Sequence, residues 1–486
     1  MSWLNAPQLA IALPAAGAVL IAATGRWPNL REGMTLITAV LLFGVVASMV
    51  SAVLAGARPE ADLFTVLPGL SLRLRVEPLG MLFGLVASGL WIVNSVYSIG
   101  YMRANREAHQ TRFYVCFAIA LASTMGVAFA GNLLTLFLFY EALTLSTYPL
   151  VTHHGTPEAR RAGRVYLGLL LGTSTGLLLL AIAWTWLLAG TTAFAPGGIL
   201  AGTAGDLTLG VLLALYVFGI GKAALMPFHR WLPAAMIAPT PVSALLHAVA
   251  VVKAGAFSVV KVIVYVFGLS HGAGVASAEW LPVAAGFTIV AASIIALRSD
   301  NLKRRLAYST VSQLSYVVLG AALLTPVSVT AAALHIVAHA LGKITLFFAA
   351  GAIYTAAHRT EVSQLDGIGR RMPLTMTAFA IGALSMIGVP PTAGFVSKWY
   401  LVMGTLQTGH LAALAVVAAS TLLNAAYYLP IVYRAFLKAP EDAGEAAHGE
   451  APLPIVLALA ASALATVAMF FCAQLPLQLA RDITGG

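Results

Sequence analysis

Two lysines and a histidine stand inside the long apolar stretches near the middle of the chain. Lys222 and Lys253 flank a proline-rich break, and His247 comes shortly before the second lysine, in GKAALMPFHRWLPAAMIAPTPVSALLHAVAVVK. An ammonium group at membrane depth costs roughly 2.5–3.5 kcal/mol on insertion scales. Because such a group persists where it is paired, hydrated or used, we predict that these residues belong to a row of titratable groups that carries protons.

A second group of such side chains occurs in HIVAHALGK, where His335, His339 and Lys343 are spaced four residues apart. On a helix this spacing places all three on one face, in a ladder about 12 Å long. Imidazole takes and gives protons near neutral pH, so the ladder suits a proton relay. A polar helix interface is the alternative. Two histidines at this spacing also fit a metal, but a third ligand is not apparent and Lys343 would repel a cation, so we expect no metal.

Glu141 is the one acidic residue in the middle of an apolar stretch, FLFYEALTLSTYP. Buried lysines elsewhere in the chain could neutralise it, and the charge state of each partner would then depend on the other. We interpret Glu141 as a functional group, since intramembrane ionisable residues generally are functional. A static ion pair that fixes two helices together is the alternative.

The composition requires a membrane to hold these residues. The 486 residues are 60% hydrophobic and only 9% charged, whereas soluble domains carry roughly 25% charged residues. We therefore predict an all-α polytopic membrane protein with about fourteen spans. The expected spans are 8–24, 34–55, 79–99, 113–130, 132–151, 165–189, 207–227, 241–268, 280–297, 305–324, 328–356, 373–403, 411–433 and 453–475.

The basic residues predict the orientation of these spans. Of 27 Lys and Arg, eighteen fall in the connections that follow odd-numbered spans, with Arg305 at the start of the tenth span counted in the connection before it, and three fall in those that follow even-numbered spans. The positive-inside rule then places the odd-numbered connections in the cytoplasm and both termini outside, in a bacterial or archaeal plasma membrane. We expect the histidines of the odd-numbered connections, among them His153 and His154, to be solvated.

Prolines interrupt two spans beside a lysine. Pro227 follows Lys222, and Pro390 and Pro391 precede Lys398 in GVPPTAGFVSKW. Backbone breaks at membrane depth occur where the backbone lines a cavity or is buried in protein. The broken spans are the seventh and the twelfth, which suggests two inverted five-helix repeats, spans 4–8 and 9–13. The expected divisions are 1–111, 112–270, 271–438 and 439–486.

Four long segments resemble one family. PFHRWLPAAMIAPTPVSALLHAVAVVKAG, NLKRRLAYSTVSQLSY, HIVAHALGKITLFFAAGAIY and GVPPTAGFVSKW look like signatures of the antiporter-like subunits, and the likeness covers about residues 79–437. That family comprises proton-pumping subunits of respiratory complex I, related membrane hydrogenases and large subunits of Mrp-type Na+/H+ antiporters. The chain is most similar to the shorter members, particularly the D subunits of Mrp antiporters and their complex I relative. It departs from the family at Ala234, where an aspartate is common.

The resemblance implies a role for each candidate. Glu141 and Lys222 match the glutamate and lysine that form the family's gating pair, and Lys253 matches the central lysine of the proton path. The full expected path consists of Glu141, Lys222, His247, Lys253, His335, His339, Lys343 and Lys398.

These residues favour a proton-translocating subunit of a multi-subunit Na+/proton antiporter that works with other membrane subunits. One alternative is a proton-pumping subunit of a complex I-like oxidoreductase or membrane hydrogenase. Another is a membrane scaffold that does not pump. The sequence has no nucleotide-binding glycine pattern and no Cys/His cluster for iron–sulfur or haem, so we expect no cofactor and no redox or hydrolytic centre of its own.

Overall fold

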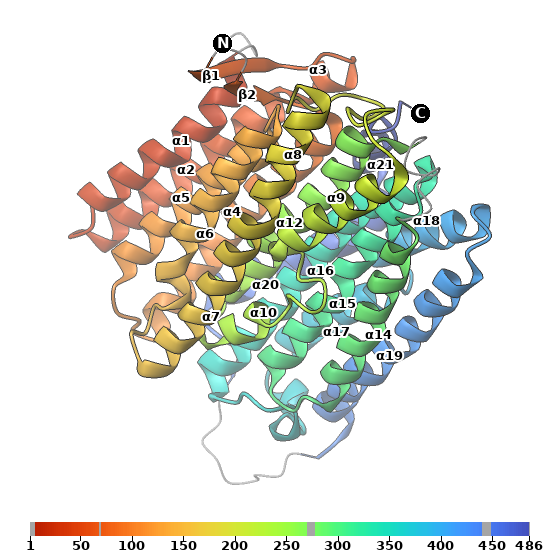
Figure 1. Ribbon diagram of the computed structural model, residues 1–486. Helices are drawn as coiled ribbons and strands as arrows, with labels where there is room; N and C mark the ends of the chain where they lie inside the picture. The colour runs from red at the N-terminus through yellow and green to blue at the C-terminus, as the bar shows by residue number, and fades with distance from the viewer. Residues whose placement is uncertain (1–4, 68–69, 270–277, 440–448, 486) are drawn as a thin grey trace.

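Apolar stretches in a bilayer must satisfy every backbone hydrogen bond internally, and a helix does this within one segment. The computed structural model describes residues 5–67, 70–269, 278–439 and 449–485, and most of them are helical (Figure 1). The first half comprises α1 (Ala6–Ala23), α2 (Pro28–Ser48), α3 (Val50–Leu54), β1 (Glu60–Leu67), β2 (Leu70–Arg75), α4 (Pro78–Ala104), α5 (Gln110–Ala128), α6 (Leu133–Val151), α7 (Pro157–Thr173), α8 (Leu179–Ala189) and α9 (Asp206–Gly219).

The second half comprises α10 (Trp231–Ala234), α11 (Thr240–Ala244), α12 (Val251–Val262), α14 (Trp280–Arg298), α15 (Leu302–Ala322), α16 (Pro326–Ala357), α17 (Pro373–Ile387), α18 (Ala393–Gln407), α19 (Leu411–Leu437), α20 (Leu453–Phe471) and α21 (Gln474–Arg481). Short π-helical turns join some of these: η2 (Ser174–Leu178) links α7 to α8, η5 (Leu245–Val249) links α11 to α12, and η6 (Ile263–Phe267) extends α12. The 3-10 turn η3 (Gly221–Ala223) follows α9.

The prediction of an all-α polytopic membrane protein is confirmed. Within the described ranges, eleven helical segments are long and apolar enough to cross a membrane, and each corresponds to one predicted span. The three other predicted spans correspond to α9, to α15 and to the pair α17 and α18. The inverted relation between two five-helix repeats stays a prediction, as do the expected divisions, of which the boundary at 270–271 lies outside the described residues.

The two interrupted spans are broken more completely than the sequence indicated. The expected seventh span, 207–227, ends as a helix at Gly219, so the break comes before Lys222 rather than at Pro227. Ala224 then adopts a left-handed backbone, φ +56°. The expected twelfth span, 373–403, is two separate helices, because Gly388 leaves α17 at φ +90° and the prolines that follow cannot resume the helix.

A β-hairpin between α3 and α4 was not predicted. Strands β1 and β2 pair antiparallel, with Glu60 opposite Arg75 and Asp62 opposite Arg73. Both pairs are bridged by their side chains, at 3.1 and 2.9 Å. The hairpin lies at the end of the bundle from which α1 starts, and α21 lies at the same end (Figure 1).

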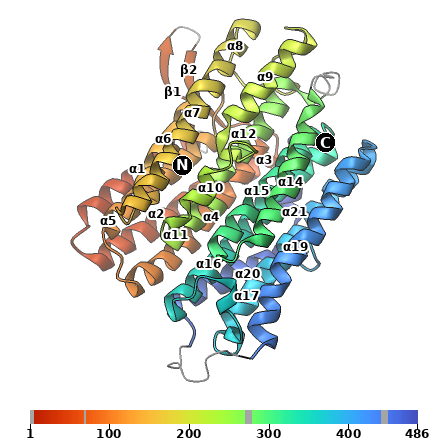
Figure 2. The ribbon, with the colours of Figure 1, turned by 60° about the horizontal axis from the view of Figure 1, so that its bottom comes forward.

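The connections gather on two opposite faces, as alternating spans require. On one face the α14–α15 connection and the α16–α17 connection pair through an isolated β-bridge between Asn301 and Glu361. On the other face Leu74 of the hairpin forms an isolated β-bridge with Ala130, which lies between α5 and α6. Seen from a second direction, the chain progresses across the bundle from α1 and α5 on one side to α19 on the other (Figure 2).

The helices that carry most of the candidate residues are also the most buried. In the most apolar 18 residues of each span, the buried share is 100% for the span 240–267 and 94% for the span 326–357. It is 33–78% for the nine other spans. These two segments, α11–α12 and α16, pack against each other. Their polar side chains therefore face protein rather than lipid.

Candidate functional site

A line of polar side chains runs from α12 across α16 to α18. The ammonium group of Lys253, which is fully buried, is hydrogen-bonded to Nδ1 of His339 on α16. One turn earlier on α16 lies His335, whose ring centroid is 6.1 Å from that of His339. Nδ1 of His335 is 2.9 Å from Oγ of Ser397, the neighbour of Lys398 in the chain. The expected ladder on α16 therefore exists and reaches a lysine at each end.

Lys398 uses backbone carbonyls that the broken span sets free. Its ammonium group donates to the carbonyl oxygens of Met386 and Ile387, at 3.0 and 2.9 Å, in the last turn of α17. Carbonyls at the end of a helix lack internal partners and form its negative pole. The break between α17 and α18 is thus the feature that makes a buried cation at this position tolerable.

Lys343 continues the face of α16 that carries the two histidines, but its contacts lead to other helices. It donates to the carbonyl of Leu306 (3.0 Å), to Oγ of Ser309 (2.7 Å) and to the hydroxyl of Tyr428 (2.9 Å). The Ser309 and Tyr428 oxygens are themselves 2.6 Å apart. Lys343 therefore lies on the same helix as His339 and His335 of the row, but it contacts α15 and α19.

His247 lies in the π-helical turn η5, ahead of α12. Its Nδ1 is 2.9 Å from Oγ1 of Thr310 on α15, and its ring packs against Phe347 of α16, with centroids 4.6 Å apart. Its Nε2 is buried and has no hydrogen-bond partner among the described residues. The structure thus places His247 beside the row with one ring nitrogen unused.

Lys222 and Glu141 come from neighbouring helices but do not form an ion pair in the part of the chain that the structure describes. Lys222 donates to the carbonyl of Tyr140 (2.8 Å) and to Oγ1 of Thr144 (2.6 Å), and its ammonium group lies 3.1 Å from the centroid of the Tyr140 ring. Both carboxylate oxygens of Glu141 are buried without a hydrogen-bond partner. A static ion pair between these two residues is therefore not what holds α6 against the segment after α9.

Gly255 explains how the Lys222 segment approaches α12. A Cβ atom at this position would overlap the main chain of Lys222 and Ala223. Only glycine allows two backbones to lie this close. The turn that carries Lys222 therefore lies against α12 two residues beyond Lys253, so these two lysines come from segments in backbone contact.

Several neutral side chains that complete the row were not singled out from the sequence. Oε1 of Gln313 accepts a hydrogen bond from Nε2 of His335 (3.1 Å). The Tyr316 ring stacks on the His335 ring, with centroids 5.4 Å apart, and lies 5.0 Å below the Lys398 ammonium. Both belong to STVSQLSY, an unusually polar run within a span. Its polarity was the available signal.

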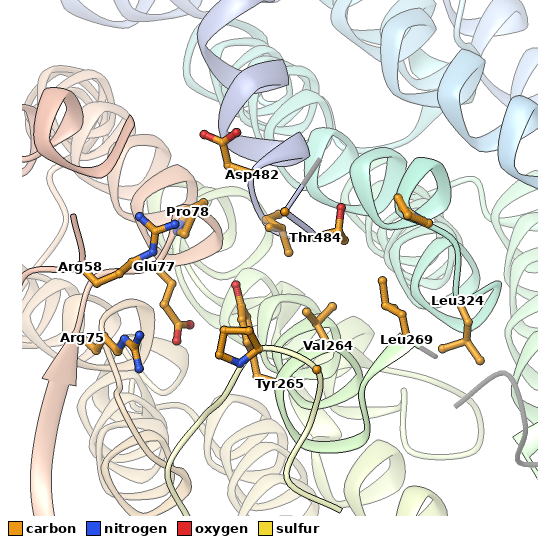
Figure 3. Close-up of a pocket in the computed structure, with 15 residues that line it drawn as sticks. Arg58, Arg75, Glu77, Pro78, Val264, Tyr265, Leu269, Leu324, Asp482 and Thr484 are labelled. Atoms are coloured by element: carbon orange, nitrogen blue, oxygen red, sulfur yellow. The ribbon is translucent and has the colours of Figure 1, made fainter. Parts of the chain in front are cut away.

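Glu77 is the second residue that sequence reasoning missed. Its carboxylate forms a buried ion pair with Lys261, at 3.1 Å, and Lys261 also donates to the carbonyl of Ala130. Glu77 lies just before the expected span 79–99, so the apolar pattern did not indicate a buried carboxylate there. Glu77 also lines a pocket of about 610 Å³, in which Arg58, Arg75 and Glu77 group on one side (Figure 3).

The comparisons with known proteins show the family and the fold of the chain. The sequence profile described as NADH:quinone oxidoreductase/Mrp antiporter, TM matches residues 130–424, which include every candidate residue. The chain belongs to this family. NADH-quinone oxidoreductase subunit N of Desulforudis audaxviator is 36% identical to it over 397 residues, which cover 80% of this chain and 77% of the relative.

Other members of the NADH:quinone oxidoreductase/Mrp antiporter family are longer. The A subunit of the Na(+)/H(+) antiporter of Alkalihalophilus pseudofirmus is 32% identical over 68% of this chain, but the match spans only 42% of the relative. Among solved structures, a chain of the Mrp complex from Dietzia sp. DQ12-45-1b superposes with a TM-score of 0.89 at 23% identity, over 100% of this chain and 97% of that one. A chain of an archaeal membrane-bound sulfane sulfur reductase superposes with a TM-score of 0.86 at 25% identity, over 98% and 97%.

Proposed function

We propose that this proton-translocating membrane subunit belongs to a multi-subunit Na+/proton antiporter, in which it moves protons along the buried row. Protons reach the row near His247 and Lys253, pass along α16 and leave near Lys398. Partner membrane subunits supply the rest of the assembly. The chain's similarity to antiporter subunits supports this proposal.

The observation that carries the proposal is the succession of three titratable groups, with Lys253 bonded to His339 and the His335 ring next to that of His339. An ammonium group bonded to an imidazole nitrogen can pass its proton across that bond, and the second imidazole is one helical turn away. Ser397 and Gln313 extend the row from His335 toward α18 and α15.

Lys222 and Glu141 act as the gate in this proposal. When the negative charge of Glu141 no longer neutralises the ammonium group of Lys222, that group repels the protonated side chains of the row. Two unit charges 4 Å apart interact by roughly 4 kcal/mol at an effective dielectric constant of 20. A change of this order corresponds to about a thousandfold in a proton equilibrium, which is enough to move a proton from one lysine to the next.

The decisive experiment compares two replacements of Lys253 in membrane vesicles that contain the chain with its native partners. Lys253→Arg keeps a positive charge and a donor, but a guanidinium does not release its proton at physiological pH. Lys253→Met removes both. We expect each variant to assemble and to lose at least about tenfold of cation-driven proton movement, a loss typical of removing a proton-transfer group. Normal transport by Lys253→Arg would contradict the relay.

A redox-driven complex is the second candidate function, and a specific observation favours it. The 36% identity to an NADH-quinone oxidoreductase subunit extends over four-fifths of this chain and most of that relative. The two functions share the same proton path and differ in the partner subunits. Purification of the native assembly distinguishes them, because a redox-driven complex contains iron–sulfur subunits, which absorb visible light, and an antiporter does not.

A further inference from the structure

A cavity of about 240 Å³ opens on the face of the odd-numbered connections, which the positive-inside rule assigns to the cytoplasm. Its walls include the ends of α11, α15 and α16, which contribute Thr240, Lys303 and Ala350. A water molecule occupies about 30 Å³ in the liquid, so the cavity has room for roughly eight.

Three ionisable side chains of different types line this cavity. Glu107, in the connection between α4 and α5, has a half-buried carboxylate 3.7 Å from Nδ1 of His154. His154 is 37% exposed and lies at the mouth. Lys303, in the first turn of α15, donates to the carbonyl of Ala238 at 2.5 Å. A carboxylate, an imidazole and an ammonium group thus share one water-accessible space.

Each wall of the cavity leads to the buried row. Two helical turns, or seven residues, return a helix to the same face about 10 Å further along. Seven residues beyond Lys303 on α15 is Thr310, which is hydrogen-bonded to His247, and His247 itself lies in the π-helical turn that follows α11 and Thr240. On α16, which runs in the opposite direction, Lys343 lies seven residues before Ala350. All three walls therefore point to the region around His247.

Unpartnered hydroxyl and imidazole groups occupy the space between the cavity and the row. Ser243 is one turn beyond Thr240 on the way to His247, and it is fully buried. Its Oγ has no hydrogen-bond partner among the described residues, and neither has Nε2 of His247. Buried polar atoms of this kind are normally satisfied by ordered water, and water at these two atoms would connect the cavity to His247.

We infer that Glu107, His154 and Lys303 form a proton-collecting site that supplies His247 from the cytoplasmic side. Protons move from bulk water to this cluster and then through water and the Ser243 hydroxyl to the row. The inference rests on the proposed function and adds to it the residues that take protons up.

The environment of the cluster suits proton collection near neutral pH. Burial raises the pKa of Glu107 above its ordinary value, while the charges of His154 and Lys303 oppose the rise. Burial lowers the pKa of Lys303 to about 7, against the opposing effect of Glu107. The other charged or titratable groups of this region are Tyr101, His109, Arg112, His153, Tyr354 and Arg359.

His153 does not take part in this exchange of protons. It was expected to be solvated, but its side chain is only 1% exposed, since it packs edge-on against Phe113. Burial lowers the pKa of His153 to about 4, so this imidazole remains neutral between pH 6 and 8. His154, on the surface, is therefore the histidine of the cluster that meets bulk protons first.

The test uses inverted membrane vesicles, in which the cytoplasmic face meets the medium. For Glu107→Gln we expect cation-driven proton uptake to fall about tenfold at an external pH of about 8 and to be near normal at about pH 6, because local collection limits the rate only when protons are scarce. A mobile buffer such as imidazole restores the rate at high pH. Glu158→Gln, at an exposed site on the neighbouring connection, is the matched control and has no effect.

A loss that is equal at every pH and insensitive to buffer would overturn the collecting role, and so would an unchanged rate. Lys253→Arg, assayed alongside, separates the two claims. If Lys253→Arg abolishes transport while Glu107→Gln has none of the expected effect, the result supports the relay and contradicts the collecting site. If Lys253→Arg transports normally, the relay itself falls.

The hydroxyl link has its own test. Ser243→Ala removes no hydrogen bond between described residues, so the variant is expected to fold and assemble normally. It should slow proton uptake several-fold at low and high pH alike, because the step lies beyond the collecting site. Ser258→Ala, which removes another fully buried and unpartnered hydroxyl from α12, should leave the rate unchanged. Equal rates in the two variants would contradict the link.

Discussion

The buried lysines fall into two kinds according to the atoms that receive their protons. In the described ranges, Lys222, Lys343 and Lys398 bond to carbonyl and hydroxyl oxygens, and Lys253 bonds to an imidazole. All these partners are neutral or can share a proton. Among the buried lysines of these ranges, only Lys261 forms an ion pair with a buried carboxylate. A lysine bonded to neutral groups can lose its proton without leaving an unpaired charge, whereas deprotonated Lys261 would leave the buried carboxylate of Glu77 unpaired, which is strongly destabilising.

This distinction predicts opposite consequences for the two acidic partners. Glu141→Gln preserves the shape of a side chain whose oxygens have no partners, so the stability of the assembly should change little. Transport should nevertheless fall by about tenfold or more, because a neutral amide cannot gate Lys222. Glu77→Gln leaves Lys261 without its counterion and should cost about 3–5 kcal/mol of stability.

The measurements for these two variants are thermal inactivation of the purified assembly and proton uptake by vesicles. The gate would be contradicted by a Glu141→Gln variant that transports normally. A Glu77→Gln variant with unchanged thermal stability would contradict the structural role of the ion pair.

At the scale of elements, the close approach of η3 to α12 holds the gating lysine near the row. Gly255→Ala would drive a Cβ into the main chain of Lys222 and Ala223, neither of which can swing away like a flexible side chain. Overpacking of this kind costs about 1–3 kcal/mol. We expect lower thermal stability and weaker transport, measured on the purified assembly and in vesicles.

Gly168→Ala is the matched control for that substitution. Gly168 also lies in a helix, α7, and no atom lies within 4 Å of its would-be Cβ. Replacing an exposed helical glycine by alanine is stabilising by roughly 0.5–1 kcal/mol. If Gly255→Ala behaved like Gly168→Ala, the contact between η3 and α12 would not position Lys222.

Hydropathy and residue spacing predicted the elements better than their breaks and partners. The ladder on α16 followed from the four-residue spacing of His335 and His339, because a helix fixes which side chains share a face. The break at Gly219 did not follow, because glycine inside an apolar run is compatible with a helix until tertiary contacts decide otherwise. Contacts between spans, such as Lys261 with Glu77 or Gln313 with His335, depend on packing that no local pattern encodes.

At the scale of the molecule, the row crosses the bundle sideways while its two ends need access to opposite faces. The cavity near Glu107 and Lys303 opens on one face. The α3–α4 hairpin and the ends of α1 and α21 lie at the other (Figure 1). The direction of proton movement therefore depends on which face is cytoplasmic, and this is what the distribution of basic residues predicts.

The orientation can be measured with single cysteines. Replacing Cys116 and Cys472 by serine gives a background in which Glu158→Cys marks the face of the odd-numbered connections and Thr65→Cys marks the hairpin; both positions are exposed. Because eighteen of 27 basic residues occupy the odd-numbered connections, we expect a membrane-impermeant maleimide to label position 158 only in inverted vesicles and position 65 only in intact cells. The reverse pattern would place the Glu107 cavity outside, so that it could not collect protons from the cytoplasm. Labelling of both positions from one side would contradict the alternation of fourteen spans on which the path depends.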